Sequence, residues 1–154
     1  MTLIVRVARL GEAAELAEIF HRAVQAAERY SKAQRDAWSP DCPEAARWAA
    51  RLRGLRTLVA ERAGKPIGFM ALREDGYLDL AFVDPDFARQ GVGSVLLDGI
   101  LTEARGLGLR RLWTEASLVA RPFFEGRGWV VLGQQLVEKR GVEMTNFRME
   151  FVIP

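Results

Sequence analysis

The most informative segment of the sequence is Val83-Asp84-Pro85-Asp86-Phe87-Ala88-Arg89-Gln90-Gly91-Val92-Gly93-Ser94-Val95-Leu96-Leu97. It joins an apolar run with the composition of a strand to a segment with apolar residues every three to four positions. The pattern predicts a strand, a loop and a helix that begins at about Gly91. A helix start exposes unpaired N–H groups and the positive end of its dipole. Gly91 and Gly93 lack the Cβ atoms that would keep an anion away, which is typical of a phosphate- or pyrophosphate-binding loop.

Neither common nucleotide-binding fingerprint is complete in this loop. A P-loop requires Gly-Lys-Ser/Thr, and Gly93-Ser94 lacks the lysine. The dinucleotide fingerprint requires a third glycine and follows the first strand of its unit, whereas this loop follows the fourth predicted strand. Small residues for close helix packing are the alternative explanation of the two glycines. We therefore do not expect NAD to bind.

The segments on either side of this loop predict a mixed α/β domain. The second predicted helix has Asp41 as a candidate cap and Pro43 in its first turn. The order β-α-α-β-β-β-α-β-α-β-β predicts a mixed sheet with helices on both faces, in a single domain over residues 1–154. The predicted strands are residues 3–7, 57–62, 67–72, 77–83, 109–115, 129–138 and 142–151, and the predicted helices are about 14–30, 43–54, 91–106 and 120–127.

Composition argues against several classes of protein. The 154 residues are 49% hydrophobic and 27% charged, which is ordinary for a soluble globular domain. The 22 basic and 20 acidic residues leave a net charge of +2, so we expect no nucleic-acid partner. No apolar run approaches the roughly 18 residues of a membrane span, and the N-terminal stretch lacks the pattern of a signal peptide.

The chain has one cysteine, Cys42, and one histidine, His21. A lone cysteine forms no internal disulfide and fits a reducing compartment, so we expect a cytoplasmic protein. One histidine and one cysteine do not make a zinc site of the usual kind, so we expect no metal. They also do not favour a Ser-His-Asp or Cys-His mechanism. Any chemistry is therefore expected from a bound cofactor or from carboxylates and phenols.

The loop and the segments around it resemble the GNAT acetyltransferases. Residues 88–93 are similar to motif A of that family, a Gln/Arg-x-x-Gly-x-Gly/Ala loop around the pyrophosphate of acetyl-coenzyme A, with Ala88 in place of Gln or Arg. Residues 120–129 are similar to motif B, which usually ends in Tyr-x-x-x-Gly-Phe. The resemblance covers nearly the whole chain. It implies the GNAT fold, with a central, mostly antiparallel sheet of six to seven strands and about four flanking helices.

The resemblance also implies where acetyl-coenzyme A binds as the cosubstrate. The backbone around Phe82 and Val83 would meet the acetyl and pantetheine parts. Ser117 stands where the family often has an asparagine that bonds the pantetheine arm, and because serine is shorter, that contact runs through water or is absent. The N–H groups of one run of residues would meet the pyrophosphate: Arg89, Gln90, Gly91, Val92, Gly93 and Ser94. Side chains of Arg89 and Gln90 can add contacts, although Arg89 is equally explained as a solvated loop charge.

Acetyl transfer to an amine requires a neutral amine, donors for the oxyanion and a proton for the thiolate. In the family a motif B tyrosine often supplies that proton, but this position is Phe124, which leaves the general acid unassigned. The base is often a carboxylate on the fourth strand. Asp79 occupies that strand, and alternation places it on one face with Tyr77, Ala81 and Val83. A carboxylate bonded to a neighbouring loop or arginine is the alternative role of Asp79.

Two further residues are candidates for the catalytic machinery. Tyr77 precedes Asp79 on the same strand, and its alternative role is packing with a satisfied hydroxyl. Glu115 ends the fifth predicted strand beside Ser117, and its alternative role is a salt bridge at the sheet edge. We test Asp79 first as the base and Glu115 next.

The resemblance places the acceptor amine against the first two helices and the loop between them. The candidate substrate-binding residues there are Tyr30, Gln34 and Trp38, one helical turn apart if the helix persists. An aromatic-lined pocket suits an aliphatic or aromatic amine, in part through cation–π contacts. A hydrophobic lid packed on the sheet is the alternative explanation of the aromatic residues.

The leading hypothesis is an acetyl-CoA-dependent N-acetyltransferase. It would move an acetyl group to an amine of a small molecule or peptide by direct attack in a ternary complex. One alternative is a non-catalytic acyl-CoA-binding module, motivated by Phe124, and a less favoured one is an RNA-acetylating toxin of the same fold. The terminal hairpin at 130–151 alternates apolar and polar residues, and family members often dimerise through such strands, so a homodimer is expected.

Overall fold

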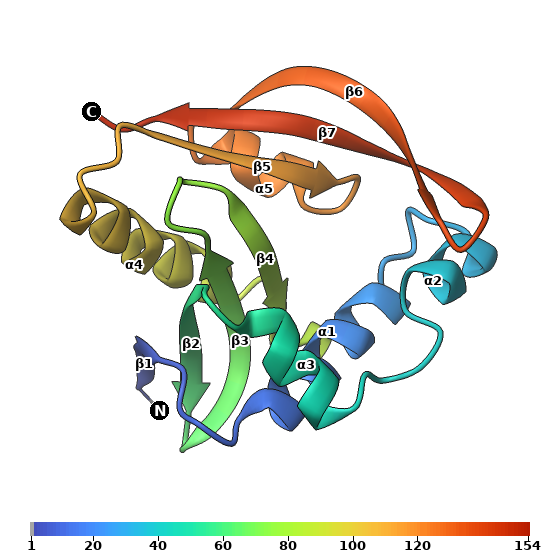
Figure 1. Cartoon of the computed structure of the whole chain (residues 1–154), viewed down its shortest axis with the longest axis horizontal. Coiled ribbons are helices and arrows are strands. Elements are labelled where there is room, and N and C mark those ends of the chain that lie inside the picture. Colours follow the sequence, from blue (N-terminus) through green and yellow to red (C-terminus); the bar gives the residue numbers. More distant parts are fainter. Residues whose placement is uncertain (1) are drawn as a thin grey trace.

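The computed structural model describes residues 2–154, so Met1 of the predicted domain lies outside the described residues. Strands and helices follow one another as Figure 1 shows. The strands are β1 (Leu3–Val7), β2 (Arg56–Arg62), β3 (Lys65–Leu72), β4 (Leu78–Val83), β5 (Arg111–Ser117), β6 (Val130–Lys139) and β7 (Val142–Val152). The helices are α1 (Ala13–Gln25), α2 (Lys32–Trp38), α3 (Ala45–Leu52), the 3₁₀ turn η1 (Pro85–Phe87), α4 (Val92–Gly106) and α5 (Arg121–Gly126).

The strands form two antiparallel sheets, in the orders β1-β2-β3-β4 and β5-β7-β6. A parallel bridge between Tyr77 and Trp113 joins them, and Trp113 N donates to Gly76 O at 3.1 Å. Gly76 has φ +105°, and an added Cβ would lie 2.5 Å from Arg111 O, so this junction requires glycine. Beyond the junction β4 and β5 diverge, which opens a gap between the two sheets (Figure 1).

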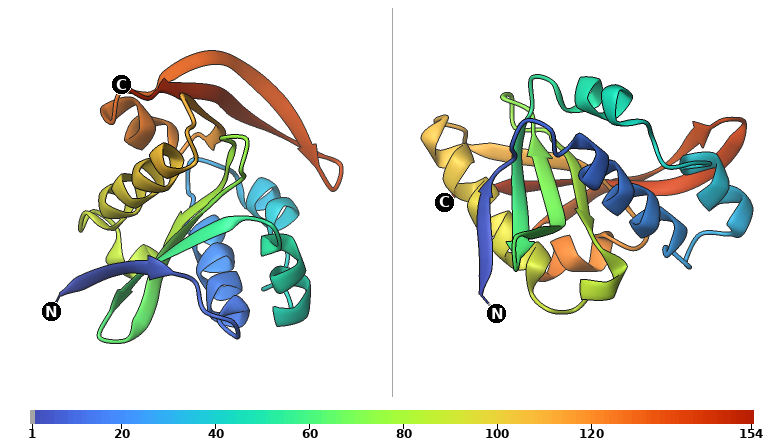
Figure 2. Two further views of the ribbon diagram at one scale, coloured as in Figure 1. Left: turned by 60° about the vertical axis from the view of Figure 1, so that its left-hand side comes forward. Right: turned by 90° about the horizontal axis from the view of Figure 1, so that it is seen from below.

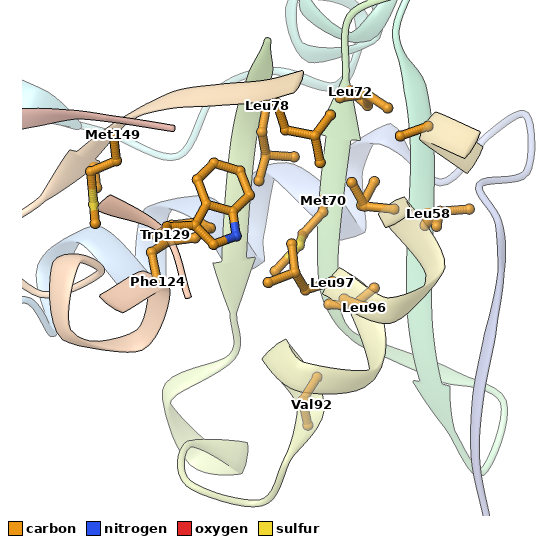
Figure 3. Packing of buried hydrophobic residues seen from close by; sticks show 14 of the residues in the cluster. Leu58, Met70, Leu72, Leu78, Val92, Leu96, Leu97, Phe124, Trp129 and Met149 are labelled. Atoms are coloured by element: carbon orange, nitrogen blue, oxygen red, sulfur yellow. The ribbon is translucent and has the colours of Figure 1, made fainter. Parts of the chain in front are cut away.

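Helices cover both faces of the four-stranded sheet (Figure 2). On one face α4 packs its buried residues Leu96, Leu97 and Ile100 against β2, β3 and β4. The helix α5 continues that core through Phe124, which lies near Leu96 and Leu97 (Figure 3). On the other face α1 and α3 form a second cluster around Phe20 and other aromatic rings. Each fully buried apolar side chain of this size contributes about 1.5–3 kcal/mol.

The mixed α/β fold with predominantly antiparallel strands is confirmed, and it differs from the prediction in the first two helices. The first helix was expected to run to about Tyr30, but it ends at Gln25, and a separate helix α2 follows. Ser31 starts α2 with a capping box, in which its Oγ accepts from Gln34 N at 3.1 Å and its N–H donates to Gln34 Oε1 at 2.9 Å. The Ser-x-x-Gln sequence therefore begins a new helix just after Tyr30.

The helix α3 also begins later than predicted. Its N-cap is Glu44, with an extended backbone at φ −65° and ψ 146°, so neither Asp41 nor Pro43 lies in its first turn. Residues 39–44 instead form a non-helical segment that lines the cleft described below. Among residues 2–154, no helix is long and apolar enough to cross a membrane.

Candidate active site

A cleft of about 830 Å³ lies where β4 and β5 diverge, bounded by the α2–α3 segment and the β6–β7 hairpin. Its lining combines aromatic rings with charges of both signs. The aromatic lining residues are Phe20, Tyr30, Trp38, Trp48, Tyr77, Phe82 and Phe124. The charged lining residues are Asp41, Glu44, Arg47, Arg51, Asp79, Glu115, Lys139 and Arg140.

The loop that precedes α4 has the geometry of an anion-binding helix start. Gly91 is the N-cap with φ +80°, and Arg89 also has a positive φ of 61°. Residues 89–91 are exposed, so the first N–H groups of α4 face an open loop. The Gln90 side chain accepts a hydrogen bond from Arg62 at 2.8 Å, which ties the loop to β2.

The two glycines of the loop serve different purposes. Apart from its chain neighbours, an added Cβ at Gly91 would meet no described atom within 4 Å, so this glycine is required by its left-handed backbone and leaves the helix start open. At Gly93 an added Cβ would lie 3.2 Å from the Phe123 ring of α5. Gly93 therefore permits close packing of α4 and α5, which is the alternative explanation that the sequence left open.

Arg22 and Asp84 hold the segment between β4 and the loop. The nearly buried Asp84 accepts from Asp86 N at 2.9 Å and caps η1. From α1, Arg22 donates to Asp84 Oδ2 at 2.6 Å and to Asp86 Oδ2 at 2.9 Å. This bridge between distant parts of the chain fixes where β4 ends and where the loop begins.

The residues expected beside the pantetheine arm lie at the gap between β4 and β5. Phe82 lines the cleft and contacts Phe20 edge-on, with 5.0 Å between ring centroids. The Val83 side chain packs with the α4 cluster, so only its backbone is available at the gap. Ser117 Oγ accepts from Ala120 N at 3.0 Å, and this bond shapes the turn into α5.

A β-bulge on β4 decides which way Asp79 points. Leu72 pairs with Leu78 and Ala71 with Leu80, so Asp79 is an extra residue between them. The prediction that Asp79 shares a face with Ala81 and Val83 is wrong for this reason, because those two side chains pack on the α4 side. Asp79 turns instead toward α3.

On α3, Arg51 engages both oxygens of Asp79. Arg51 Nη1 donates to Oδ2 at 2.7 Å and Nη2 donates to Oδ1 at 2.8 Å. This bidentate bond raises the pKa of Arg51, and the Asp79 side chain is 18% exposed. The geometry favours the arginine-paired role of Asp79 over that of a free base.

Tyr77 and Glu115, predicted separately, form one hydrogen-bonded group with Gln135. The Tyr77 hydroxyl donates to Glu115 Oε1 at 3.1 Å, and Gln135 Nε2 donates to Glu115 Oε2 at 2.6 Å. Burial, and then the charge of Glu115, raise the pKa of Tyr77, so its phenol stays protonated at neutral pH. Sequence reasoning missed Gln135, because only the pairing of β5, β7 and β6 brings it beside Glu115.

Of the three predicted acceptor-binding residues, two line the cleft and one does not. Tyr30 and Trp38 line the cleft, with 5.8 Å between their rings. The buried Tyr30 hydroxyl donates to Thr145 O at 2.6 Å and accepts from Leu118 N at 3.0 Å, so it ties the segment before α2 and the turn after β5 to β7. Gln34 is not among the cleft-lining residues, since its amide closes the capping box and donates to Glu143 O at 3.0 Å.

Comparison with known proteins identifies the family. Residues 26–151 match the family model described as an acetyltransferase (GNAT) domain. The chain belongs to the GNAT family. It is 37% identical over 143 residues to the uncharacterized N-acetyltransferase YafP of Escherichia coli, covering 92% of this chain and 90% of that protein. It is 32% identical over 146 residues to the peptidyl-lysine N-acetyltransferase YjaB of Salmonella typhimurium, covering 92% of each chain.

A solved structure extends this agreement to the whole fold. A GCN5-related N-acetyltransferase from Rhodopseudomonas palustris superposes with a TM-score of 0.92 at 32% identity, covering 99% of this chain and 96% of that one. The GNAT fold and the acetyl-CoA-dependent N-acetyltransferase activity predicted from the sequence are confirmed. The individual cofactor, catalytic and acceptor residues stay predictions.

The motif B position differs from the GNAT pattern in a way that the packing explains. Phe124 is 2% exposed and packs against Trp129, with 4.8 Å between ring centroids. Its ring belongs to the α4–α5 core and also borders the cleft, so the usual tyrosine hydroxyl is replaced by an apolar surface.

Cys42 and His21 show no arrangement for catalysis. Cys42 is exposed, and partial loss of water together with the charge of Glu18 raises the pKa of its thiol, which is the wrong direction for a nucleophile at neutral pH. His21 Nδ1 lies 2.7 Å from Ser39 Oγ, in a contact between α1 and the segment after α2. Within the described part of the chain, no three His, Cys, Asp or Glu side chains gather as metal ligands.

Proposed function

We propose that this GNAT enzyme transfers the acetyl group of acetyl-CoA to a primary amine of a small molecule or peptide, by direct attack in a ternary complex. The observation that carries the proposal is the cleft itself, which contains the Tyr77–Glu115 pair and opens beside β4. The relative YjaB is named a peptidyl-lysine N-acetyltransferase, so a lysine ε-amine is a natural member of this acceptor class.

Residues at the start of α4 fit the pyrophosphate of the cosubstrate. The open space and positive φ at Gly91 leave room for an anion beside the N–H groups of Val92, Gly93 and Ser94. The diverging backbones near Phe82 and Ser117 would hold the pantetheine arm. When bound, acetyl-CoA supplies the acetyl thioester, and the remaining work falls to side chains of this chain.

We assign the base to Glu115 in preference to Asp79. Both Asp79 oxygens are engaged by a bidentate arginine, and taking up a proton would disrupt that ion pair. The Glu115 side chain is exposed to the cleft, and its two hydrogen bonds from Tyr77 and Gln135 fix its orientation. A carboxylate held in this way accepts the amine proton directly or through a water molecule.

Phe124 gives no proton to the leaving thiolate, and the chemistry tolerates this. A cysteine thiol has a pKa of about 8.5, and a thiolate of such low basicity is a tolerable leaving group without prior protonation. Tyr77 stays protonated and orients Glu115, because its hydroxyl donates to that carboxylate. The reaction thus needs a base and a positioned amine more than a strong acid.

The test measures release of free coenzyme A thiol with a broad panel of primary amines. We expect turnover, and we expect Glu115→Gln to lower kcat/KM by about 10²–10⁴-fold while the Kd for acetyl-CoA is retained. Glu103→Gln is the matched control, since Glu103 lies on α4 in a surface ion pair with Arg56. Binding of acetyl-CoA without turnover of any amine would contradict the proposal and favour a non-catalytic acyl-CoA-binding module.

A further inference from the structure

Two cations at the tip of the β6–β7 hairpin flank Trp38 in the cleft. Lys139 Nζ lies 6.0 Å from the centre of the Trp38 ring. Arg140 Nη1 donates to Ala37 O at 2.7 Å and to Trp38 O at 3.4 Å. Both side chains line the acceptor cleft, and together they form the Lys139–Arg140 pair.

The Lys139–Arg140 pair has no carboxylate partner among residues 2–154. Arg51, the neighbouring cleft cation, is neutralised by Asp79, whereas neither Lys139 nor Arg140 lies within 4.0 Å of a described carboxylate. The bonds to the end of α2 use only Nη1 of Arg140, so the Nε and Nη2 donors make no hydrogen bond within the described chain. The Arg140 guanidinium is therefore held in place by Nη1, and its other N–H donors are free to bind a ligand.

Lys139 is the more deeply placed of the two cations. It is half-buried, and loss of water lowers the pKa of its ammonium, with the charges of Arg140 and Arg51 acting in the same direction and that of Glu115 opposing them. A partly desolvated cation that no carboxylate contacts directly is costly, and an anion beside it would relieve that cost. The Trp38 ring compensates only in part through its negative face.

We propose that the Lys139–Arg140 pair binds a carboxylate of the acceptor, so the preferred substrate is a primary amine that also carries a carboxylate several bonds away. The inference rests on the proposed function, in which Glu115 receives the amine proton. Gln135, which bonds Glu115, and Lys139 are four residues apart on the same face of β6, a separation of about 13 Å between Cα atoms. The side chains of Gln135 and Lys139 occupy part of that distance. The gap that is left between Glu115 and the Lys139–Arg140 pair fits an extended ω-amino acid, or a lysine beside an acidic residue in a peptide.

The experiment compares acceptors that differ only in this charge. Rates are measured for ε-aminocaproate against ε-aminocaproamide, and for a lysine peptide with a neighbouring glutamate against the same peptide with glutamine. We expect at least one acid to exceed its amide by about 10- to 100-fold in kcat/KM, the range of a charge-assisted contact. A preference confined to the peptide pair identifies the source as a peptide, and one confined to the free acid identifies a small molecule.

Variants test whether the preference for the acid over the amide depends on the Lys139–Arg140 pair. Lys139→Gln should cause the larger fall in the ratio of acid to amide, Arg140→Gln a smaller fall, and the double variant should bring the ratio to about one. Lys65→Gln is the matched control, because Lys65 is an exposed lysine at the start of β3 and does not line the cleft. Equal use of acid and amide by the unaltered enzyme, or a ratio that survives Lys139→Gln, would overturn the proposal while leaving the proposed function intact.

A second measurement is independent of turnover. Modification of Lys139 by an amine-reactive reagent is followed by mass spectrometry, with ε-acetamidocaproate or its amide present. Protection by the acid alone, about tenfold, supports the carboxylate site even if no amine is acetylated, in which case only the proposed function falls. Equal modification in both cases contradicts the site.

Discussion

The cofactor loop and the acceptor cleft differ in how far apart in the sequence their parts lie. The loop is a continuous run from β4 into α4, and its essential features are a helix start and a glycine with positive φ. The cleft takes side chains from α2, α3, β4, β5, β6 and β7, so its chemistry depends on which strands pair. Local structure can be predicted from neighbouring residues, whereas an assembled surface cannot, and this difference leads to distinct experiments on each region.

The largest expected effect is on the loop. Gly91→Glu should weaken acetyl-CoA binding on the order of 100-fold or more, because a carboxylate there would repel the pyrophosphate at the helix start. Calorimetry measures the affinity. Gly54→Glu is the control, since Gly54 has φ +81° and open space around it but lies outside the loop. Unchanged affinity in a folded Gly91→Glu variant would remove the basis for placing the pyrophosphate at α4.

A comparison of variants at Asp79 and Glu115 tests which carboxylate in the cleft is the general base. We expect Asp79→Asn to lower kcat less than about tenfold, in contrast to the larger loss in Glu115→Gln, because Asp79 is an arginine partner and not the base. Its free energy of unfolding should fall by about 0.5–1 kcal/mol, in keeping with a partly exposed ion pair. Arg51→Gln should cost a similar amount, and the double variant should cost less than the sum. A loss of turnover in Asp79→Asn as great as in Glu115→Gln would return the base to Asp79.

Gly93 is expected to serve the packing of α4 against α5, whereas Gly91 is expected to serve cofactor binding. Gly93→Ala places a methyl group against the Phe123 ring and should lower the free energy of unfolding by about 1–2 kcal/mol. Phe123→Leu in the same chain should recover part of that loss, as measured by chemical denaturation. If Gly93→Ala leaves stability unchanged while acetyl-CoA binding weakens, then this glycine serves the cofactor and not the contact between α4 and α5.

The smallest expected effect is on the free energy of unfolding at alkaline pH. The chain has two tyrosines, Tyr30 and Tyr77, and burial raises the pKa of each. The folded state therefore keeps protons that the unfolded state loses above about pH 10, so stability is full below that pH and falls as the pH rises. The loss is at most about 1.4 kcal/mol per pH unit for each tyrosine. Tyr77→Phe should make the decline shallower, and tyrosinate absorbance that appears near pH 10 in the folded protein would contradict the burial of both phenols.

The class of fold and the position of the cofactor loop can both be predicted from the amino-acid sequence. Strand and helix periodicity, together with Gly91 at a helix start, led to the GNAT resemblance, because those features arise between residues close in the chain. Local signals were also present where the prediction failed, since Ser31 and Gln34 form a capping box that begins α2. The capping box directly follows a stretch with helical spacing of apolar residues, and that spacing predicted one helix as far as Tyr30.

Which carboxylate is available in the cleft depends on long-range contacts in the folded chain. A bulge opposite β3 turns Asp79 toward Arg51, and strand pairing brings Gln135 to Glu115 and places Lys139 and Arg140 beside Trp38. None of these contacts follows from alternation along one strand, because an inserted residue changes the face that each side chain occupies. Side-chain partners separated by many residues are set by register and by helix docking, and both are properties of the whole folded chain.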